Sequence, residues 1–142
     1  MSDRLRVVVD TNVLIGALTK PTGHGARVLE AWREGRVDVV ASEATLREAE
    51  LVLGGGWLRR LAPEEAIRGL LDELRERGVM VEGSPIRGLP LKDEGDRRLV
   101  EAAADGGARY LVTTDREVLR YRGHGDTEFV TPTELLRSGA LG

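Results

Sequence analysis

Four acidic residues are spaced so that one folded site can bring them together. Asp10 ends the apolar run RVVV, and Asp115 follows the similar run YLVTT. Asp96 and Glu48 lie in two stretches with helical periodicity. Confined carboxylates repel one another unless a cation compensates their charge. Mg²⁺ and Mn²⁺ prefer oxygen ligands and are often coordinated by protein carboxylates and a substrate phosphate together. The four acids therefore predict a divalent-metal site that acts on a phosphate group.

The chemistry expected of such a site is hydrolysis of a phosphodiester. A divalent ion activates a water molecule and stabilises charge on the phosphate oxygens. Two ions about 3.5–4 Å apart stabilise both the attacking and the leaving oxygen of an in-line displacement. The acids can serve this chemistry only if the fold gathers them.

Short apolar runs alternate with amphipathic helical patterns along the whole chain. This alternation predicts an α/β fold with a central parallel sheet, right-handed crossovers and helices on both faces. The carboxyl ends of neighbouring parallel strands meet at one edge, so Asp10 and Asp115 share that edge if their strands are adjacent. The expected strands are Val7–Val9, Val37–Ala41, Val79–Val81, Tyr110–Val112 and Glu128–Val130.

Capping and breaking residues predict where the helices begin and end. Ser42 suits the N-cap of the helix that carries Glu48, and Asp93 suits the N-cap of the helix that carries Asp96. Pro63 suits the first position of a third helix. The remaining breakers predict a helix stop at Gly54–Gly56 and loops at Thr19–Gly25, Gly83–Pro90 and Gly123–Gly125.

Length and composition predict one domain spanning residues 1–142. The absence of cysteine excludes disulfides and zinc–thiolate sites. No signal-peptide pattern and no apolar stretch near 18 residues is present, so we expect a cytoplasmic protein without a membrane segment. A net charge of -3 does not indicate a partner, and 4% aromatic residues disfavour a base-stacking platform.

Three motifs together resemble the PIN-domain ribonucleases, and more narrowly the PIN-family toxins of bacterial toxin–antitoxin systems. They are VVVDTNVLIGAL, SEATLREAELVL and DEGDRRLVEAAADGGARYLVTTDREVL, in the family's order from one end of the chain to the other. The resemblance implies a three-layer α/β/α sandwich. It also implies Mg²⁺- or Mn²⁺-dependent endonucleolytic cleavage of single-stranded RNA, a cognate antitoxin, and a homodimer or higher oligomer.

Carried over by position, the resemblance implies catalytic and metal-binding roles for Asp10, Glu48, Asp96 and Asp115. The supporting residues that it implies are Asn12, Thr113 and Asp93. Each acid also has an ordinary structural explanation: Asp93 suits a helix cap better than a direct ligand, and Glu48 has acidic neighbours typical of a solvated face. The bases available for RNA phosphates are Lys20, Arg27, Arg47, Lys92, Arg97 and Arg116.

Two other functions remain open. In a phosphohydrolase of the haloacid-dehalogenase type, the Asp after the first strand is a nucleophile. That class has a second Asp two places later, where this chain has Asn12, and a trapped aspartyl-phosphate would identify it. A non-catalytic metal- or RNA-binding module would bind the ion without turning over RNA, single-stranded DNA or phosphomonoesters.

Overall fold

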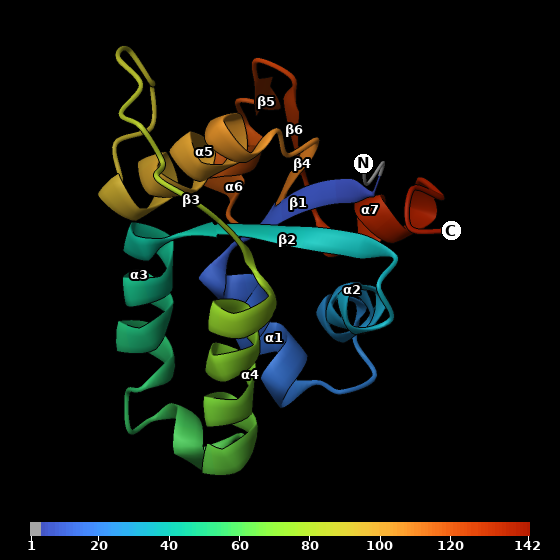
Figure 1. The fold of residues 1–142 in the computed structure, drawn as a ribbon. Helices are drawn as coiled ribbons and strands as arrows, with labels where there is room; N and C mark the ends of the chain where they lie inside the picture. Colours follow the sequence, from blue (N-terminus) through green and yellow to red (C-terminus); the bar gives the residue numbers. More distant parts are fainter. Residues whose placement is uncertain (1–3) are drawn as a thin grey trace.

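The computed structural model describes residues 4–142 and is built on a single six-stranded sheet (Figure 1). The strand order is β3-β2-β1-β4-β6-β5, and neighbouring strands are parallel except for the antiparallel pair β5 and β6. The strands are β1 (Leu5–Val9), β2 (Val37–Ser42), β3 (Val79–Val81), β4 (Tyr110–Val112), β5 (Gly123–His124) and β6 (Thr127–Val130).

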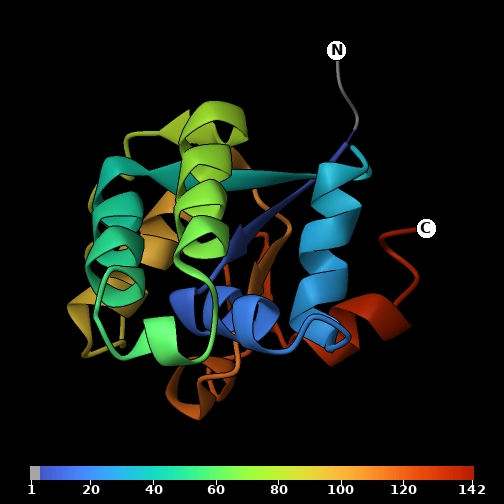
Figure 2. The same ribbon diagram turned by 90° about the horizontal axis from the view of Figure 1, so that it is seen from below.

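Helices cover both faces of this sheet. Figures 1 and 2 show α1 to α4 on one face, while α5 and α6 lie on the other. The helices are α1 (Thr11–Thr19), α2 (His24–Arg33), α3 (Glu43–Leu53), α4 (Glu64–Arg77), α5 (Glu94–Gly106), α6 (Arg116–Leu119) and α7 (Pro132–Arg137), with a 3-10 turn η1 (Leu58–Arg60).

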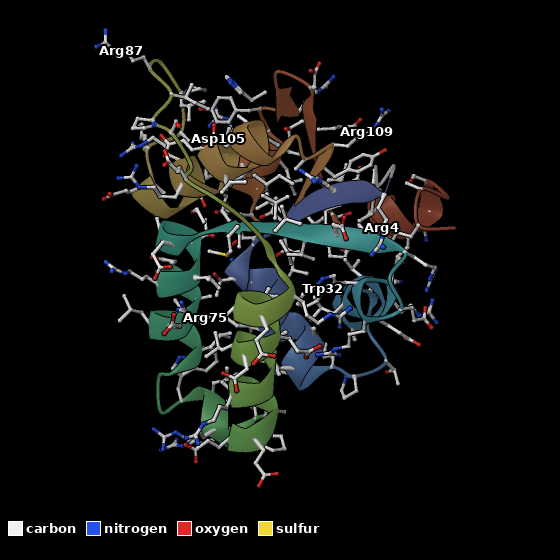
Figure 3. The ribbon with its side chains drawn as sticks, in the orientation of Figure 1. Arg4, Trp32, Arg75, Arg87, Asp105 and Arg109 are labelled. Carbon is white, nitrogen blue, oxygen red and sulfur yellow. The ribbon has the colours of Figure 1, made fainter. Side chains whose placement is uncertain are left out.

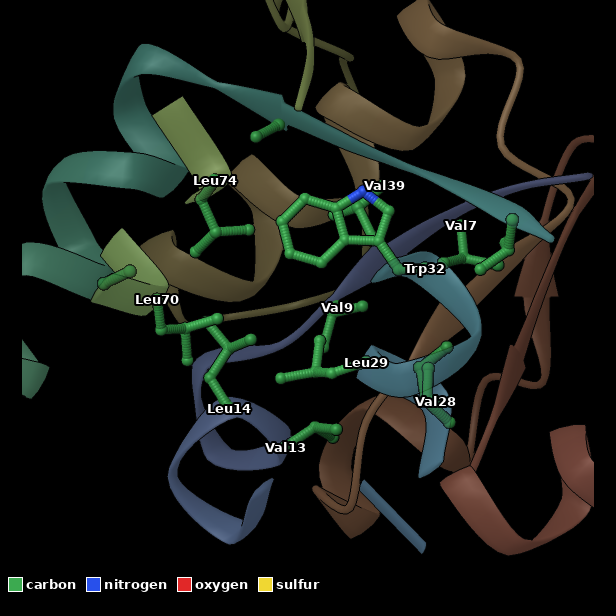
Figure 4. Packing of buried hydrophobic residues seen from close by; sticks show 14 of the residues in the cluster. Val7, Val9, Val13, Leu14, Val28, Leu29, Trp32, Val39, Leu70 and Leu74 are labelled. Atoms are coloured by element: carbon green, nitrogen blue, oxygen red, sulfur yellow. The ribbon is translucent and has the colours of Figure 1, made fainter. Parts of the chain in front are cut away.

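The central strand β1 contributes to two separate hydrophobic clusters. Val7 and Val9 pack with Trp32 on the face covered by α1 to α4, while Val8 packs with Leu111 on the face covered by α5. This alternation follows from the two-residue period of a strand. Figure 4 shows the Trp32 ring among the aliphatic side chains of the first cluster. The predicted three-layer α/β/α arrangement is therefore confirmed.

Several local predictions are confirmed and three differ. Ser42 caps α3 with a reciprocal capping box, as its position predicts. Pro63 is the N-cap of α4 rather than its first residue, because its ψ of 141° is extended. The segment Gly123–Gly125, predicted as a loop, contains β5, whose two residues pair with β6 through a turn at Gly125 with φ of 57°. Helix α2 starts at His24, inside the predicted loop Thr19–Gly25.

The expected domain of residues 1–142 is described from residue 4 onward, and residues 1–3 lie outside the described part. Within residues 4–142, no helix combines the length and the hydropathy needed to cross a membrane.

Candidate active site

The acids that end β1 and follow β4 lie at the same edge of the sheet. Strands β1 and β4 pair in parallel, with Val9 opposite Val112. The backbone N–H of Asp10 extends this ladder by donating to the Val112 carbonyl oxygen at 2.9 Å. Asp115 is the third residue after β4 and the N-cap of α6. Strands β1 and β4 are therefore neighbours, which is the condition for Asp10 and Asp115 to share one edge of the sheet.

Thr113 connects these two acids. Its side chain is fully buried, and its hydroxyl donates to Asp10 Oδ2 at 2.7 Å. The same hydroxyl oxygen accepts the backbone N–H of Asp115 at 3.0 Å. Asp115 in turn caps α6, because its Oδ1 accepts the Glu117 N–H at 2.9 Å. One buried hydroxyl thus orients the Asp10 carboxylate and fixes the backbone of Asp115.

We expect Thr113→Val to weaken both the fold and the site. The variant leaves a buried Asp10 oxygen and the Asp115 N–H without their partner, which costs about 2–3 kcal/mol of unfolding free energy. Nucleic-acid cleavage falls about tenfold because Asp10 loses its orientation. Thr113→Ser keeps the hydroxyl and is the matched control, with cleavage near wild type. Urea denaturation and initial cleavage rates measure both effects, and equal rates for Val and Ser would contradict the role of the hydroxyl.

Helix α5 brings two further acids to the same edge. Asp93 is its N-cap, and Asp93 Oδ1 accepts the backbone N–H of Asp96 at 3.0 Å. The predicted capping role of Asp93 is therefore present. Asp96 lies in the first turn of α5, where the helix dipole alone would favour its ionised form.

The pKa of Asp96 shows how close the acids are. Partial burial and the surrounding negative charges raise it from 3.8 to about 7, against the effect of the helix dipole. The pKa of Asp10 is also raised, mainly by burial, while the Thr113 hydrogen bond acts in the opposite direction. The carboxylates whose charge raises the Asp96 pKa are, largest first, Asp93, Asp115, Asp10 and Glu48.

Glu48 reaches the site from α3 because α5 carries a glycine where the two helices meet. A methyl carbon at Gly95 would lie 3.4 Å from Glu48 Oε1 and 3.0 Å from Asp93 Oδ1. The contact with Asp93 Oδ1 is tighter than ordinary van der Waals packing, whereas the contact with Glu48 Oε1 lies at its lower limit. Gly95 thus leaves the space in which the Glu48 carboxylate approaches the first turn of α5.

We expect Gly95→Ala to make the protein more stable and less active. Alanine favours the helix by about 0.5 kcal/mol, while its methyl presses on Asp93 Oδ1 and touches the Glu48 carboxylate. The resulting shift of these acids should lower cleavage about fivefold. Gly69→Ala in α4 is the matched control, since a methyl there meets nothing within 4 Å. It should add stability without changing the rate. Loss of activity in both variants would contradict a specific effect on Glu48.

The acids open into one cavity of about 190 Å³. It is lined by Asp10, Asn12, Glu48, Asp93, Asp96 and Asp115, all of which the sequence indicated, while Thr113 lies buried behind Asp10. Thr11, beside Asn12 at the start of α1, also lines the cavity, as its position next to Asp10 indicates. Four further lining residues were not predicted from the sequence. A helical period links three of them to the acids, since Thr45 and Val52 share the α3 face of Glu48 and Leu99 shares the α5 face of Asp96. The four are Thr45, Val52, Gly95 and Leu99.

The donor atoms of this cavity suit a hard divalent cation. Its charged groups are all carboxylates, and their mutual repulsion, seen in the Asp96 pKa, is what a cation would relieve. Within residues 4–142, no three His, Cys, Asp or Glu side chains are grouped closely enough to hold an ion as they stand. Hydrogen bonds already engage Asp10, Asp93 and Asp115. The set therefore fits such an ion by its chemistry, without forming a closed ligand cage.

The fold is similar to that of two solved structures. One is a chain in the crystal structure of VapBC2 from Rickettsia felis bound to a DNA fragment from their promoter, with a TM-score of 0.57 and 17% identity, covering 88% of this chain and 97% of that one. The other is in VapBC-1 from nontypeable Haemophilus influenzae, with a TM-score of 0.56 and 18% identity, covering 91% and 99%. At these identities the similarity shows the fold alone.

Sequence comparison identifies the family. An uncharacterized protein of Methanocaldococcus jannaschii, MJ1680, is 26% identical over 120 residues, which are 84% of this chain and 76% of that protein. A family model described as the PIN domain matches residues 6–117, well over half of the chain. The matched range contains all four acids of the cavity's proposed catalytic set. The chain therefore belongs to the PIN domain family.

Proposed function

We propose that this chain is a metal-dependent endoribonuclease that cleaves single-stranded RNA and acts as the toxin of a toxin–antitoxin pair. The observation that carries this proposal is the meeting of Asp10, Glu48, Asp96 and Asp115 in one cavity. These side chains come from the β1–α1 junction, α3, α5 and the β4–α6 junction, so that distant parts of the chain supply a single acidic site. Membership of the PIN family, a family of nucleases, supports the reaction class.

In this proposal the four acids hold Mg²⁺ or Mn²⁺, which would supply an activated water and charge stabilisation at the phosphate. Thr113 keeps the Asp10 carboxylate aimed at the cavity, and Asp93 fixes the first turn of α5 and thereby Asp96. Asn12 lies in the cavity wall, where its amide can donate to or accept from substrate oxygens. The protein's own contribution is thus to orient the acids and to hold them close despite their repulsion.

The RNA substrate and the toxin role rest on the likeness of the three sequence motifs to PIN-family toxins. The fold shared with chains of VapBC2 and VapBC-1 agrees with this likeness. A toxin of this kind would act on RNA in the cytoplasm and be held inactive by a cognate antitoxin. A homodimer or higher oligomer remains a prediction of the same resemblance, and light scattering of the purified chain would measure it.

Purified full-length protein tests the proposal. We expect cleavage of a fluorescein-labelled single-stranded RNA in Mn²⁺ or Mg²⁺, its loss in excess chelator, and its recovery when the ion is restored. The same experiment includes single-stranded DNA of the same sequence and a phosphomonoester. Hydrolysis of the phosphomonoester alone, with a trapped aspartyl-phosphate, would establish the phosphohydrolase alternative. Metal binding by calorimetry with no turnover on any substrate would establish the non-catalytic one.

A further inference from the structure

A second cavity of about 400 Å³ continues from the acidic one. The two share Asp93, Asp96 and Asp115, so they form one connected depression in which these acids lie at the junction. We name the second cavity the flanking groove. Beyond the shared acids it is lined by Pro90, Leu91, Lys92, Glu117, Arg120 and Tyr121.

One wall of the flanking groove is the β3–α5 loop, and α5 holds this loop in place. Arg97, Glu101 and Asp105 are four residues apart, so they lie on one face of the helix. Asp105 and Glu101 accept loop N–H groups at 2.7 and 3.1 Å, and Arg97 donates to two loop carbonyls at 3.1 and 3.0 Å. The loop groups are the N–H of Ser84 and Ile86 and the carbonyls of Leu91 and Lys92.

This arrangement changes the role expected of Arg97. The sequence reading considered it among the bases for RNA phosphates, whereas its guanidinium holds the backbone next to Lys92. Because three side chains of α5 bind the backbone of this loop, the backbone of Lys92 has a fixed position beside the groove. The groove wall is therefore built before any substrate arrives, which lowers the entropy cost of binding.

The opposite wall combines a cation with an aromatic ring. The Arg120 guanidinium carbon lies over the Tyr121 ring, 5.2 Å from its centroid. The Tyr121 hydroxyl donates to the Pro90 carbonyl at 3.5 Å, which joins the two walls. Arg120 also approaches Glu117 at 3.4 Å, but both side chains are well exposed, so this ion pair is weak and a phosphate can compete for Arg120.

We propose that the flanking groove binds the nucleotide next to the cleaved phosphodiester, with Lys92 and Arg120 on its phosphate. This inference rests on the proposed function. The cleaved phosphate would contact the divalent ions that the acids bind. The neighbouring phosphate lies beyond those ions, so it needs positively charged side chains of the protein. Arg120 supplies donors in a planar fork, and the Arg120–Tyr121 pair supplies a flat face against which a base can stack.

Binding to a fluorescein-labelled single-stranded RNA in Mg²⁺ tests this proposal without cleavage. The measurement uses full-length Asp10→Asn, because an Asn oxygen can still accept the Thr113 hydrogen bond. In this background Lys92→Gln and Arg120→Gln should each raise the Kd about tenfold, since each removes a charge-assisted phosphate contact. The slope of log K against log salt should become shallower by about 0.7 for each change.

Arg87→Gln is the matched control, because Arg87 lies on the same loop and points away from the molecule (Figure 3). It removes the same charge and should leave both the Kd and the salt slope unchanged. Arg120→Lys should restore the salt slope but only part of the affinity, because it returns the charge without the planar fork. An unchanged Kd and slope in both groove variants, or an equal loss in Arg87→Gln, would overturn the proposal.

The outcomes of this experiment and of the cleavage experiment are distinguishable. If wild type cleaves RNA and the groove variants bind normally, the groove assignment fails and the nuclease function stands. If the groove variants lose binding but wild type cleaves no RNA, the groove stands as an RNA-binding site and the catalytic proposal fails. When the same changes are made in otherwise wild-type protein, KM for cleavage should rise about tenfold with little change in kcat, because the contact is with the neighbouring phosphate and not with the phosphodiester that is cleaved.

Discussion

We expect Asp10→Asn to lower the rate of metal-dependent RNA cleavage by about 10³-fold, the loss that follows when several kcal/mol of charge stabilisation disappears. Asp10 is the most buried acid of the cavity, and Thr113 holds one of its carboxylate oxygens. Asparagine has nearly the same shape and can accept the same hydrogen bond. The variant therefore removes a negative charge while keeping the packing, so a loss of rate reports on chemistry and not on folding.

We expect a similar loss from Asp96→Asn, because the Asp96 side chain lies among the other acids. The α5 cap uses only the Asp96 backbone N–H, which donates to Asp93 Oδ1 and is retained in the variant. Glu94→Gln is the matched control: it removes an acid from the same helical turn, but Glu94 lines neither cavity. Circular dichroism verifies the fold of each variant, and initial rates in saturating Mn²⁺ measure the effect. Wild-type rates in both Asn variants would contradict the acidic site, and an equal loss in Glu94→Gln would contradict its specificity.

Asp96 also makes the metal-free protein less stable at alkaline pH. Its pKa is about 7 in the folded chain and 3.8 in the reference state. Below about pH 4 the carboxyl is protonated in both states. Between about pH 4 and 7 the unfolded chain releases a proton that the folded chain retains, so the unfolding free energy falls as pH rises. Above about pH 7 the full cost of the buried, crowded charge is present.

Asp96→Asn removes this cost. We expect the variant to exceed wild type by about 1–2 kcal/mol in unfolding free energy at pH 8 in chelator, a range discounted for the solvent exposure of Asp96. At pH 3 the two should be nearly equal, because the Asp96 carboxyl is then mostly protonated in both the folded and the unfolded chain and is neutral like the amide. Urea denaturation at the two pH values measures the difference. A variant less stable than wild type at pH 8 would show that the acids do not repel one another in the folded protein.

Adding Mn²⁺ at pH 8 should reverse this order. An ion at 100 times its Kd stabilises the folded state by about 2.7 kcal/mol, and the variant should gain much less because it lacks a ligand charge. The Tm of wild type should therefore rise above that of Asp96→Asn as the Mn²⁺ concentration increases. Such a crossing shows that the difference between the two proteins comes from the charge of Asp96 and not from misfolding of the variant. Equal Mn²⁺-induced shifts in wild type and variant would remove Asp96 from the ion site.

Local signals in the sequence were sufficient for most of the secondary structure. Val7–Val9 formed a buried strand because β-branched residues without alternation suit a strand covered on both faces. Ser42 and Asp93 capped their helices because a short oxygen side chain satisfies free N–H groups within three residues. Asp10 was recognisable because it directly follows an apolar run, and Asp115 because only two threonines separate it from another. These features depend on neighbours in the chain, so the sequence determines them almost alone.

Other features depended on contacts between distant segments. The two-residue strand β5 exists only because β6 lies beside it, and its Gly123–His124 sequence contains no strand signal. Spacing and the family resemblance selected Glu48 among the acids of α3, but only the packing of α3 against α5 places its side chain in the cavity with the other acids. The sequence made Arg97 a candidate for binding RNA phosphates, whereas in the structure its guanidinium binds carbonyl oxygens of the β3–α5 loop.

The sequence by itself therefore determined which acids are available, the elements that carry them and the order of those elements. The tertiary structure alone decided that β1 and β4 are neighbours, that Glu48 meets the first turn of α5, and that a groove with Lys92 and Arg120 continues from the acids. The physical reason is that capping, turns and periodicity act within a few residues, whereas strand order and helix approach depend on how buried surfaces from the whole chain fit together.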